Sequence, residues 1–390
     1  MEFTKTFSEL KEIFSLDNGN IILENGNGLF RPIPFTSSSN PIPYARNAIY
    51  KDANDNNLAC DDNKIAENIQ FNYLVYLPSS AAKYKKAIVL LHGLNERSWH
   101  KYLPWAQYLG QQTNRPIILF PLAFHMNRGH KSWTNPRVMM PLLNYRRSLK
   151  GLSMATFANI ALSQRLSDDP LRFFTSGKQS AEDLIQLLSS IQRGSVDFLE
   201  KGAQVDFFSY SIGSFLAQIM FLANPNNLLS SSKLFIFCGG SLFCDMQGTS
   251  RLIMDSLAYL RLHNYFLIDL EEEIKTNVQL TTFIKEGALE NAFLTMIRDD
   301  YNRDYRTHRF QELQDQMRII SLKRDTVIPS SAIHSNYKCI QNKSKEMVTE
   351  LDFPFEYSHE NTFPILPGAA SFEVDKAFNQ VFSMAVEFLC

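Results

Sequence analysis

Several features that mark specialised classes of protein are missing from the sequence. The formal net charge of the 390 residues is −1, so no excess of one sign favours nucleic acid or an anionic membrane. No run approaches the roughly 18 apolar residues of a membrane-spanning helix. The N-terminus lacks a basic start followed by an apolar core, so no secretory signal is expected. These absences predict a cytoplasmic protein without a membrane span or a nucleic-acid partner.

Metal and cofactor motifs are missing as well. The five cysteines are odd in number, and their spacing fits neither a disulfide framework nor a metal site. Cys238 lies in the apolar run LFIFCGG and is expected to be a small buried side chain. No histidine pair has the spacing of a zinc motif, and no glycine-rich loop would hold a phosphate. We therefore expect no metal and no cofactor.

What the chain does have is apolar material in alternating patterns. Hydrophobic residues make up 45% of the sequence, enough for a large core. Strand-like runs are expected at 71–78, 86–93, 115–124, 204–211, 233–240, 317–325 and 346–354. Helical patterns are expected at 180–194, with Ser180 as a plausible N-cap, and at 213–223 and 373–389. This alternation predicts an α/β fold with a mostly parallel central sheet flanked by helices.

The chain divides into an N-terminal arm and one main domain. Residues 1–65 are rich in Asn, Ser, Gly and Pro and are expected to form an irregular arm, and residues 66–390 the α/β domain. Two segments, about 126–179 and about 241–316, are too long to be simple connections. Both are expected to lie above the sheet, the second as a helical cap or lid.

Three chemically useful side chains follow predicted strands. Ser211 directly follows QVDFFSY (204–210), Asp325 directly follows MRIISLKR (317–324), and His359 comes shortly after 346–354. Ligands of parallel α/β sheets bind beyond the carboxyl ends of the strands, so these side chains are expected to meet there. Asp325 is preferred to Asp304 because Asp304 lies in the cap-like region. His92 also follows a strand, but a structural role in its loop is preferred to proton transfer.

The segment from Ser209 to Gly213 lies between a predicted strand and a predicted helix. A nucleophilic serine needs an exposed oxygen and a nearby backbone N–H for the oxyanion, and a sharp strand-to-helix turn supplies both. Such a turn is crowded, so its flanking positions must be small, as Ser209 and Gly213 are. The helix that begins near Ile212 also directs its positive end towards developing negative charge.

With these residues, the sequence resembles the α/β-hydrolase superfamily over roughly residues 70 to 390. The resemblance rests on the elbow at 209–213, the His92-Gly93-Leu94 turn and the chain order Ser211, Asp325, His359. It implies Ser211 as nucleophile, His359 as general base and Asp325 as the group that orients His359. It also implies that the backbone N–H groups of Leu94 and Ile212 form the oxyanion hole. The family commonly has glycine where this chain has Ser209.

The segment 125–140 is a second candidate region, because it leaves the sheet at the same end. Arg128, His130 and Trp133 are its candidate substrate-binding residues, as a patch that grips a carboxylate or phosphate. The preferred alternative is that its charges pair with acidic residues of the cap.

The sequence therefore predicts a serine hydrolase, a carboxylesterase or lipase-like enzyme that acts on a small ester-like substrate through an acyl-enzyme. A thioesterase or a peptidase with the same three residues remains open, as does a non-catalytic binding protein of the same fold.

Overall fold

The computed structural model of the chain describes residues 1–23, 28–39, 62–78, 83–149, 154–285, 287–338, 340, 347–368 and 370–390. Among these residues, one sheet has the strand order β1-β2-β3-β5-β4-β6-β7-β8-β9. The strands are β1 (Ile21–Ile22), β2 (Leu29–Thr36), β3 (Gln70–Leu77), β4 (Tyr84–Leu91), β5 (Ile117–Leu119), β6 (Leu199–Tyr210), β7 (Leu234–Phe237), β8 (Met317–Leu322) and β9 (Val348–Leu351). The six strands from β5 to β9 in this order are parallel, and β1 to β3 pair antiparallel.

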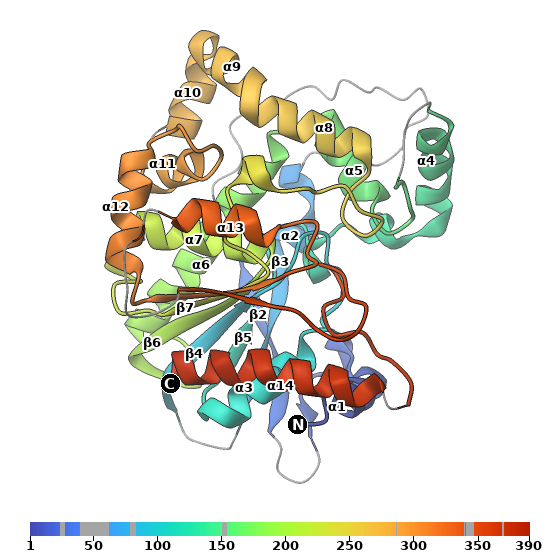
Figure 1. The fold of residues 1–390 in the computed structure, drawn as a ribbon, viewed down its shortest axis with the longest axis vertical. Helices are drawn as coiled ribbons and strands as arrows, with labels where there is room; N and C mark the ends of the chain where they lie inside the picture. The colour runs from blue at the N-terminus through green and yellow to red at the C-terminus, as the bar shows by residue number, and fades with distance from the viewer. Residues whose placement is uncertain are drawn as a thin grey trace.

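Helices cover both faces of the sheet, as Figure 1 shows. On one face lie α1 (Phe3–Ile13), α3 (Leu103–Thr113) and α14 (Ala370–Leu389). On the other lie α6 (Arg172–Arg193), α7 (Ile212–Ala223) and α13 (Ser330–Tyr337). The mostly parallel sheet between two helical layers confirms the predicted α/β fold with a mostly parallel central sheet flanked by helices.

The central strand β6 shows why the sequence folds this way. Successive side chains of a strand point to opposite faces, so Phe207 enters the core beneath α6 and α7 while Phe208 enters the core beneath α3 and α14. Phe208 stacks on Phe382 of α14, with ring centroids 5.2 Å apart. A strand buried on both faces reads as a continuous apolar run, which is the pattern that predicted it.

The predicted strands all occur, with different ends. The segment expected at 115–124 forms a strand only over β5, Ile117–Leu119. The helix expected to start at Ser180 begins at Arg172. Ser180 is not an N-cap, because its hydroxyl donates to the carbonyl of Ser176 and accepts from the backbone N–H of Ala123. Polar residues inside the helix thus resembled an N-cap, and the predicted start of the helix came too late in the sequence.

Residues 1–23 and 28–36 are not the irregular arm expected from their composition. Here α1 packs on α14, where Phe3 stacks on Phe378 with ring centroids 4.5 Å apart. β2 pairs with β3 along its whole length, although it contains Pro32 and Pro34. Among the described residues, β1 pairs only with Leu29 and Phe30 of β2, so the prolines lie along an edge of β2 without a described partner strand, and no described ladder bond is lost there. Most of the rest of the expected arm, 40–61, lies outside the described residues.

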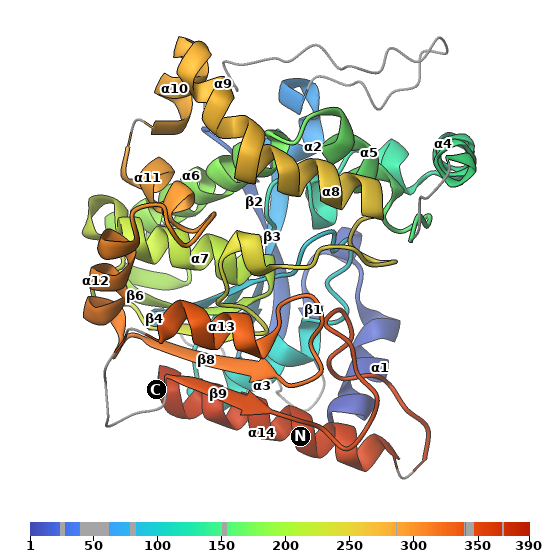
Figure 2. The same cartoon turned by 45° about the horizontal axis from the view of Figure 1, so that its top comes forward.

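The two long excursions contain further helices above the sheet. The first holds α4 (Pro136–Ser148), α5 (Ile160–Asp168) and the start of α6. The second holds α8 (Ser256–Asn264), a π-helical turn (Tyr265–Asp269), α9 (Leu270–Thr276), α10 (Val278–Lys285), α11 (Ala288–Thr295) and α12 (Arg303–Leu313). In Figure 2 these helices form a layer on the side of the sheet that carries α7.

Polar contacts join the two excursions. Arg146 of α4 makes two hydrogen bonds of 2.7 Å to the carboxylate of Asp255, which caps α8. The Asn95 amide donates to the carbonyls of Ala158 (2.9 Å) and Leu252 (2.7 Å), one in each excursion. The loop after β4 is therefore tied to both.

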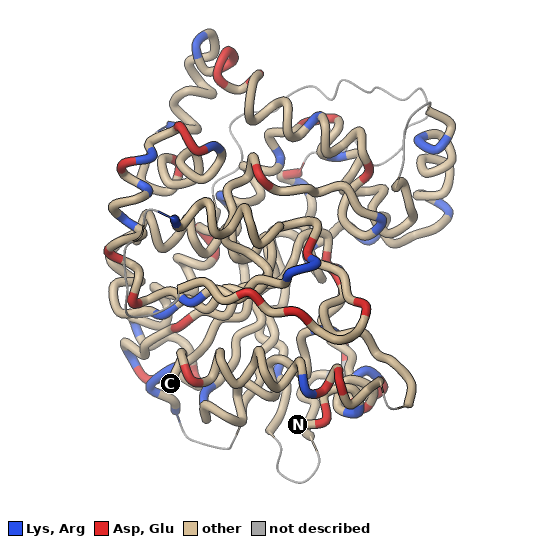
Figure 3. The backbone as a smooth tube through the Cα atoms, viewed as in Figure 1, with Lys and Arg blue, Asp and Glu red and all other residues tan. Residues whose placement is uncertain are grey.

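Charged residues of both signs are interspersed along the described chain (Figure 3). Among the described residues, none of the helices is both long and apolar enough to cross a bilayer. Cys238 is fully buried, as predicted, whereas Cys60 and Cys339 lie outside the described residues.

Candidate active site

Ser211 lies in the turn between β6 and α7. Its backbone angles, φ 55° and ψ −122°, belong to a region that residues with a side chain rarely adopt. A Cβ on Gly213 would lie 2.8 Å from the carbonyl oxygen of His92, so this position requires glycine. Ser209 is fully buried and donates from its hydroxyl to the Phe235 carbonyl at 3.2 Å. Small residues at 209 and 213 thus allow the sharp turn that the sequence predicts.

The structure brings Ser211, His359 and Asp325 together from three different loops. Ser211 Oγ lies 2.6 Å from His359 Nε2, and His359 Nδ1 lies 2.7 Å from Asp325 Oδ2. The three residues are 5%, 3% and 4% exposed, respectively. They form a continuous hydrogen-bonded chain from hydroxyl to imidazole to carboxylate, shielded from bulk water.

The outer members of this chain are held by further bonds. Asp325 Oδ1 accepts the backbone N–H groups of Val327 and Ile328, each at 2.9 Å. This leaves Oδ2 to accept the bond from His359. The Tyr210 hydroxyl donates to the His359 carbonyl, and the two rings stack at 5.6 Å with an interplanar angle of 19°. Tyr210 thereby positions the loop that carries His359.

The turn after β4 faces the same region. The Gly93 N–H donates to the Tyr102 hydroxyl at 3.0 Å, which fixes the turn just before Leu94. Leu94 and Ile212, the two residues predicted to supply oxyanion N–H groups, line one cavity together. Ile212 directly follows Ser211, and the Gly213 N–H donates to the His92 carbonyl at 3.1 Å, which joins this elbow to the turn that carries Leu94.

His92 has both ring nitrogens occupied by the backbone. Its Nδ1–H donates to the Gly93 carbonyl at 2.8 Å, and its Nε2 accepts the N–H of Leu122 at 3.0 Å. Complete burial, with smaller contributions from nearby cations, lowers its pKa to about 3. His92 is therefore a neutral, structural side chain, as preferred from the sequence.

His125 is a second buried neutral histidine. Its Nδ1–H donates to the Ala123 carbonyl at 2.8 Å, and its buried Nε2 has no hydrogen-bond partner among the described residues. Burial is the main reason that its pKa falls to about 3, with the charges of Arg97 and Arg128 acting in the same direction.

These two histidines predict acid instability. Their pKa values are about 3 in the folded chain, against an ordinary value of 6.5. Between these values the unfolded chain binds more protons than the folded chain, so stability is full above about pH 6.5 and falls as the pH falls. At pH 5 each histidine should lower the free energy of unfolding by about 2 kcal/mol. Urea unfolding at several pH values measures this fall.

The matched variants for that measurement are His125→Gln and His334→Gln. His125→Gln should remove about half of the histidine-dependent fall, whereas the exposed His334 should leave it unchanged. Identical pH profiles for wild type and His125→Gln would contradict the assignment of a neutral buried His125.

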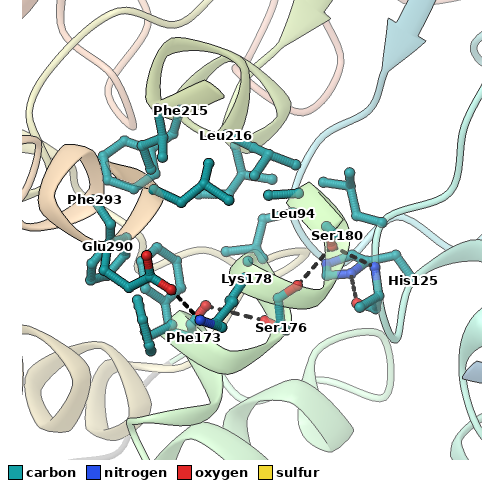
Figure 4. Close-up of a pocket in the computed structure, with 18 residues that line it drawn as sticks. Leu94, His125, Phe173, Ser176, Lys178, Ser180, Phe215, Leu216, Glu290 and Phe293 are labelled. Carbon is teal, nitrogen blue, oxygen red and sulfur yellow. Dashed lines mark hydrogen bonds and ion pairs between the residues drawn. The ribbon is translucent and has the colours of Figure 1, made fainter. Parts of the chain in front are cut away.

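An apolar cavity of about 60 Å³ lies beside Ile212. Figure 4 shows Phe173, Phe215, Leu216 and Phe293 around it, with Leu94 and His125 at its other side. We call it the apolar cavity; its lining includes Leu94, Leu122, Phe173, Phe174, Ile212, Phe215, Leu216, Ile219, Leu289 and Phe293. Its polar wall carries an ion pair between Lys178 of α6 and Glu290 of α11.

A second cavity, of about 290 Å³, adjoins the apolar cavity. We call it the cationic cavity; four cationic side chains line it, namely Arg97, Lys131, Arg165 and Arg172. The two cavities share Leu94, Ala123, His125, Phe173 and Ser176. Both cavities therefore reach the turn at Leu94, and the apolar cavity also reaches Ile212, the residue that directly follows Ser211.

The three predicted substrate-binding residues do not all line the same cavity in the structure. His130 and Trp133 line the cationic cavity. Arg128 does not: it is fully buried, pairs with Asp183 at 2.7 Å and also donates to Asn68 and to the Pro121 carbonyl. Its guanidinium is occupied inside the protein, so the expectation of a substrate contact for Arg128 is wrong. It does pair with an acid, but that acid belongs to α6 and not to the cap.

The whole chain, residues 1–390, matches the model of one protein family, described as a family of unknown function, DUF6051. The chain belongs to this family. No curated protein matches this DUF6051 chain.

Solved structures similar to this DUF6051 member include three from different sources. Carboxyl esterase 2 of the mycorrhizal fungus Tuber melanosporum is 10% identical with a TM-score of 0.45, over 99% of this chain and 97% of that chain. A cold-adapted esterase from an Arctic intertidal metagenomic library is 8% identical with a TM-score of 0.42, over 96% and 98%. A peroxisomal alpha-beta-hydrolase of Saccharomyces cerevisiae is 13% identical with a TM-score of 0.38, over 91% and 90%.

Sequence reasoning missed several residues of this DUF6051 site. Tyr210 is the second residue of the elbow, but nothing in the sequence shows that its hydroxyl reaches the His359 carbonyl. Arg97 lies only three residues after the turn at 92–94, and this closeness in the sequence could have indicated that it lies near the site. The pairing of Lys178 with Glu290 joins segments more than a hundred residues apart, and no local pattern indicates it. Among the described residues, no group of His, Cys, Asp or Glu side chains is arranged to hold a metal ion.

Proposed function

We propose that the protein is a serine hydrolase that cleaves a carboxylic ester through an acyl-enzyme. The observation that carries the proposal is the buried chain of hydrogen bonds from Ser211 through His359 to Asp325, with lengths of 2.6 and 2.7 Å. A serine hydroxyl is a poor nucleophile at neutral pH, and a positioned imidazole that accepts its proton is what activates it. A Ser211 backbone held in a rare conformation also favours a functional role.

The first half of the proposed reaction forms the acyl-enzyme. Ser211 Oγ attacks the ester carbonyl carbon while His359 Nε2 takes the hydroxyl proton. The carbonyl oxygen becomes an oxyanion, which the backbone N–H groups of Leu94 and Ile212 stabilise. The Asp325 carboxylate stabilises the imidazolium of His359. His359 then gives its proton to the leaving alkoxide, and the alcohol departs.

The second half hydrolyses the acyl-enzyme. A water molecule gives a proton to His359 Nε2 and attacks the acyl carbon, and the same N–H groups again hold the oxyanion. Collapse of this intermediate returns the proton to Ser211 Oγ and releases the carboxylic acid. The burial of all three side chains supports this route, because their hydrogen bonds are stronger where bulk water is excluded.

The apolar cavity predicts a preference for short acyl groups. At about 60 Å³, it has room for roughly four to six groups the size of water or methylene. Among p-nitrophenyl esters, we expect kcat/KM to peak near butyrate and to fall by about tenfold or more at decanoate, because a longer chain must displace packed aromatic side chains. The series from acetate to decanoate measures this profile. A rate that rises steadily to decanoate would contradict the assignment of the acyl group to this cavity.

The bond type is tested with one acyl group on three leaving groups. A butyryl ester, a butyryl thioester and a butyryl anilide share the acyl part, so their relative kcat/KM values report the preferred bond. Ester cleavage well ahead of the other two supports a carboxylesterase. Preference for the thioester or the anilide would move the proposal to a thioesterase or a peptidase with the same three residues.

A further inference from the structure

The cationic cavity begins at the turn that carries Leu94. Asn95, Glu96 and Arg97 line it directly after this turn, and Trp133 lines it from the first excursion. Because Leu94 lines both cavities, the two parts of an ester held at Ser211 can lie one in each. The chemistry of the cationic cavity therefore bears on the second part of the substrate.

Most charges around this cavity are already paired within the protein. Asp62 accepts two bonds from Arg165, at 2.8 and 3.1 Å, and one from Arg172 at 3.0 Å. Glu96, one of two acidic residues of the lining, lies 2.7 Å from Lys101. Glu67 is the other acidic residue of the lining. Asp62 thus pairs with two guanidinium groups, and the lining of the cavity keeps an excess of positive charge.

Arg97 differs from the other two arginines of the cavity. Its Nη1 donates to the Trp133 carbonyl at 2.8 Å, and that bond fixes the direction of the guanidinium. Among the described residues, no carboxylate lies within ion-pair distance of Arg97. Burial lowers its pKa, which is the sign of a cation that has lost water without gaining an acidic partner. An arginine in this position is ready to bind an anion from outside the protein.

His130 supplies a second donor to the same cavity. Its Nδ1 accepts the backbone N–H of Ser132 at 3.2 Å, so in the neutral ring the proton is on Nε2. His130 and Lys131 both line the cavity. In the part of the chain that the structure describes, Arg97 is the guanidinium of this lining that has no acidic partner, and its planar fork matches a carboxylate.

We propose that the cationic cavity binds a carboxylate of the substrate, with Arg97 as the specificity-determining residue. This inference rests on the proposed hydrolysis at Ser211. The substrate class is then an ester with a short apolar group on one side of the scissile bond and a carboxylate on the other. Arg97 forms charge-assisted hydrogen bonds to the carboxylate, and it takes no part in the bond changes.

Paired esters test this proposal. The charged p-butyryloxybenzoate is compared with the neutral p-butyryloxybenzamide, and mono-p-nitrophenyl glutarate with p-nitrophenyl pentanoate. Wild type should favour at least one charged ester over its neutral partner by about 10- to 100-fold in kcat/KM. Arg97→Gln should abolish the preference, Arg97→Lys should keep part of it, and Arg137→Gln, an exposed arginine of α4 outside the cavity, should keep all of it.

The outcomes separate this inference from the proposed function. If neutral esters are hydrolysed but neither charged ester is favoured, or if the preference survives in Arg97→Gln, the carboxylate site is overturned and the hydrolase stands. If no ester is hydrolysed, the proposed function fails. The carboxylate site is then tested without hydrolysis, by calorimetry of p-hydroxybenzoate binding. Binding that Arg97→Gln weakens about tenfold or more, with p-hydroxybenzamide bound weakly by both proteins, supports it; equal binding by both proteins overturns it.

Discussion

Replacing Ser211 with alanine is expected to lower kcat/KM for p-nitrophenyl butyrate by about 10⁴-fold or more, with no loss of fold. The hydroxyl is the atom that would form the covalent bond, and the remaining imidazole and N–H groups supply only the residual rate. Alanine tolerates the rare backbone angles of this position about as well as serine does, because both carry a Cβ. Steady-state kinetics and the free energy of unfolding are measured on the same samples.

The matched control is Ser214→Ala, one turn further along α7. The Ser214 hydroxyl is buried and has no hydrogen-bond partner among the described residues, so its removal costs no bond. Ser214→Ala should keep nearly full activity. Activity retained by Ser211→Ala would rule out Ser211 as the nucleophile, and loss in both variants would point to damage of α7.

Replacing Asp325 with asparagine is expected to lower kcat by a factor on the order of 10⁴. Two backbone N–H groups hold Oδ1, so the amide oxygen takes that place and the NH₂ takes the place of Oδ2. The amide then presents a donor to His359 Nδ1, which must become an acceptor. The imidazole proton moves to Nε2, where it faces Ser211 Oγ, and the ring can no longer accept the serine proton.

Asp304→Asn is the control for this variant, since Asp304 is an exposed residue at the start of α12. It should leave kcat within about twofold, as surface substitutions usually do. A small effect of Asp325→Asn with a large effect of Asp304→Asn would mean that the carboxylate beside His359 plays no part in the reaction.

The positions of Ser211, Asp325 and His359 could be predicted because a parallel sheet brings its strand ends together. Each residue follows a strand that the apolar pattern reveals, and the elbow has the small neighbours that its turn requires. Their meeting at hydrogen-bond distance depends on loop paths, above all the loop from β9 to His359. Strand prediction alone could not supply those distances.

The N-terminal segment could not be predicted, because its signals conflict. Pro32 and Pro34 argue against a strand, but β2 places them along an edge where no described ladder bond is lost. The amphipathic pattern of α1 is short, and the helix is stabilised by tertiary contact with α14, including a bond of 2.8 Å from the Thr4 N–H to Asp375. Contacts between residues more than 370 positions apart in the sequence therefore determine the structure of this segment.

The prediction of Arg128 as a substrate-binding residue shows the same limit of sequence-based prediction at the site. Arg128 and Arg97 are both basic residues near the active-site end of the sheet, and the sequence does not show which one meets an acid. Asp183 of α6 neutralises Arg128, whereas Arg97 meets the Trp133 carbonyl. Pairing is a three-dimensional property, so the sequence could not show that Arg128 is neutralised inside the protein, and the predicted segment 125–140 did not include Arg97.

The most direct test of the account is labelling of the native protein with a fluorophosphonate, followed by peptide mass mapping. A phosphonyl group forms a stable bond only with a serine whose proton is removed as it attacks. The account predicts a single labelled peptide, modified at Ser211, with no labelling in Ser211→Ala and slow labelling in Asp325→Asn. Folded protein that stays unlabelled, or that is labelled at another serine, would contradict it and favour a binding protein built on the same fold.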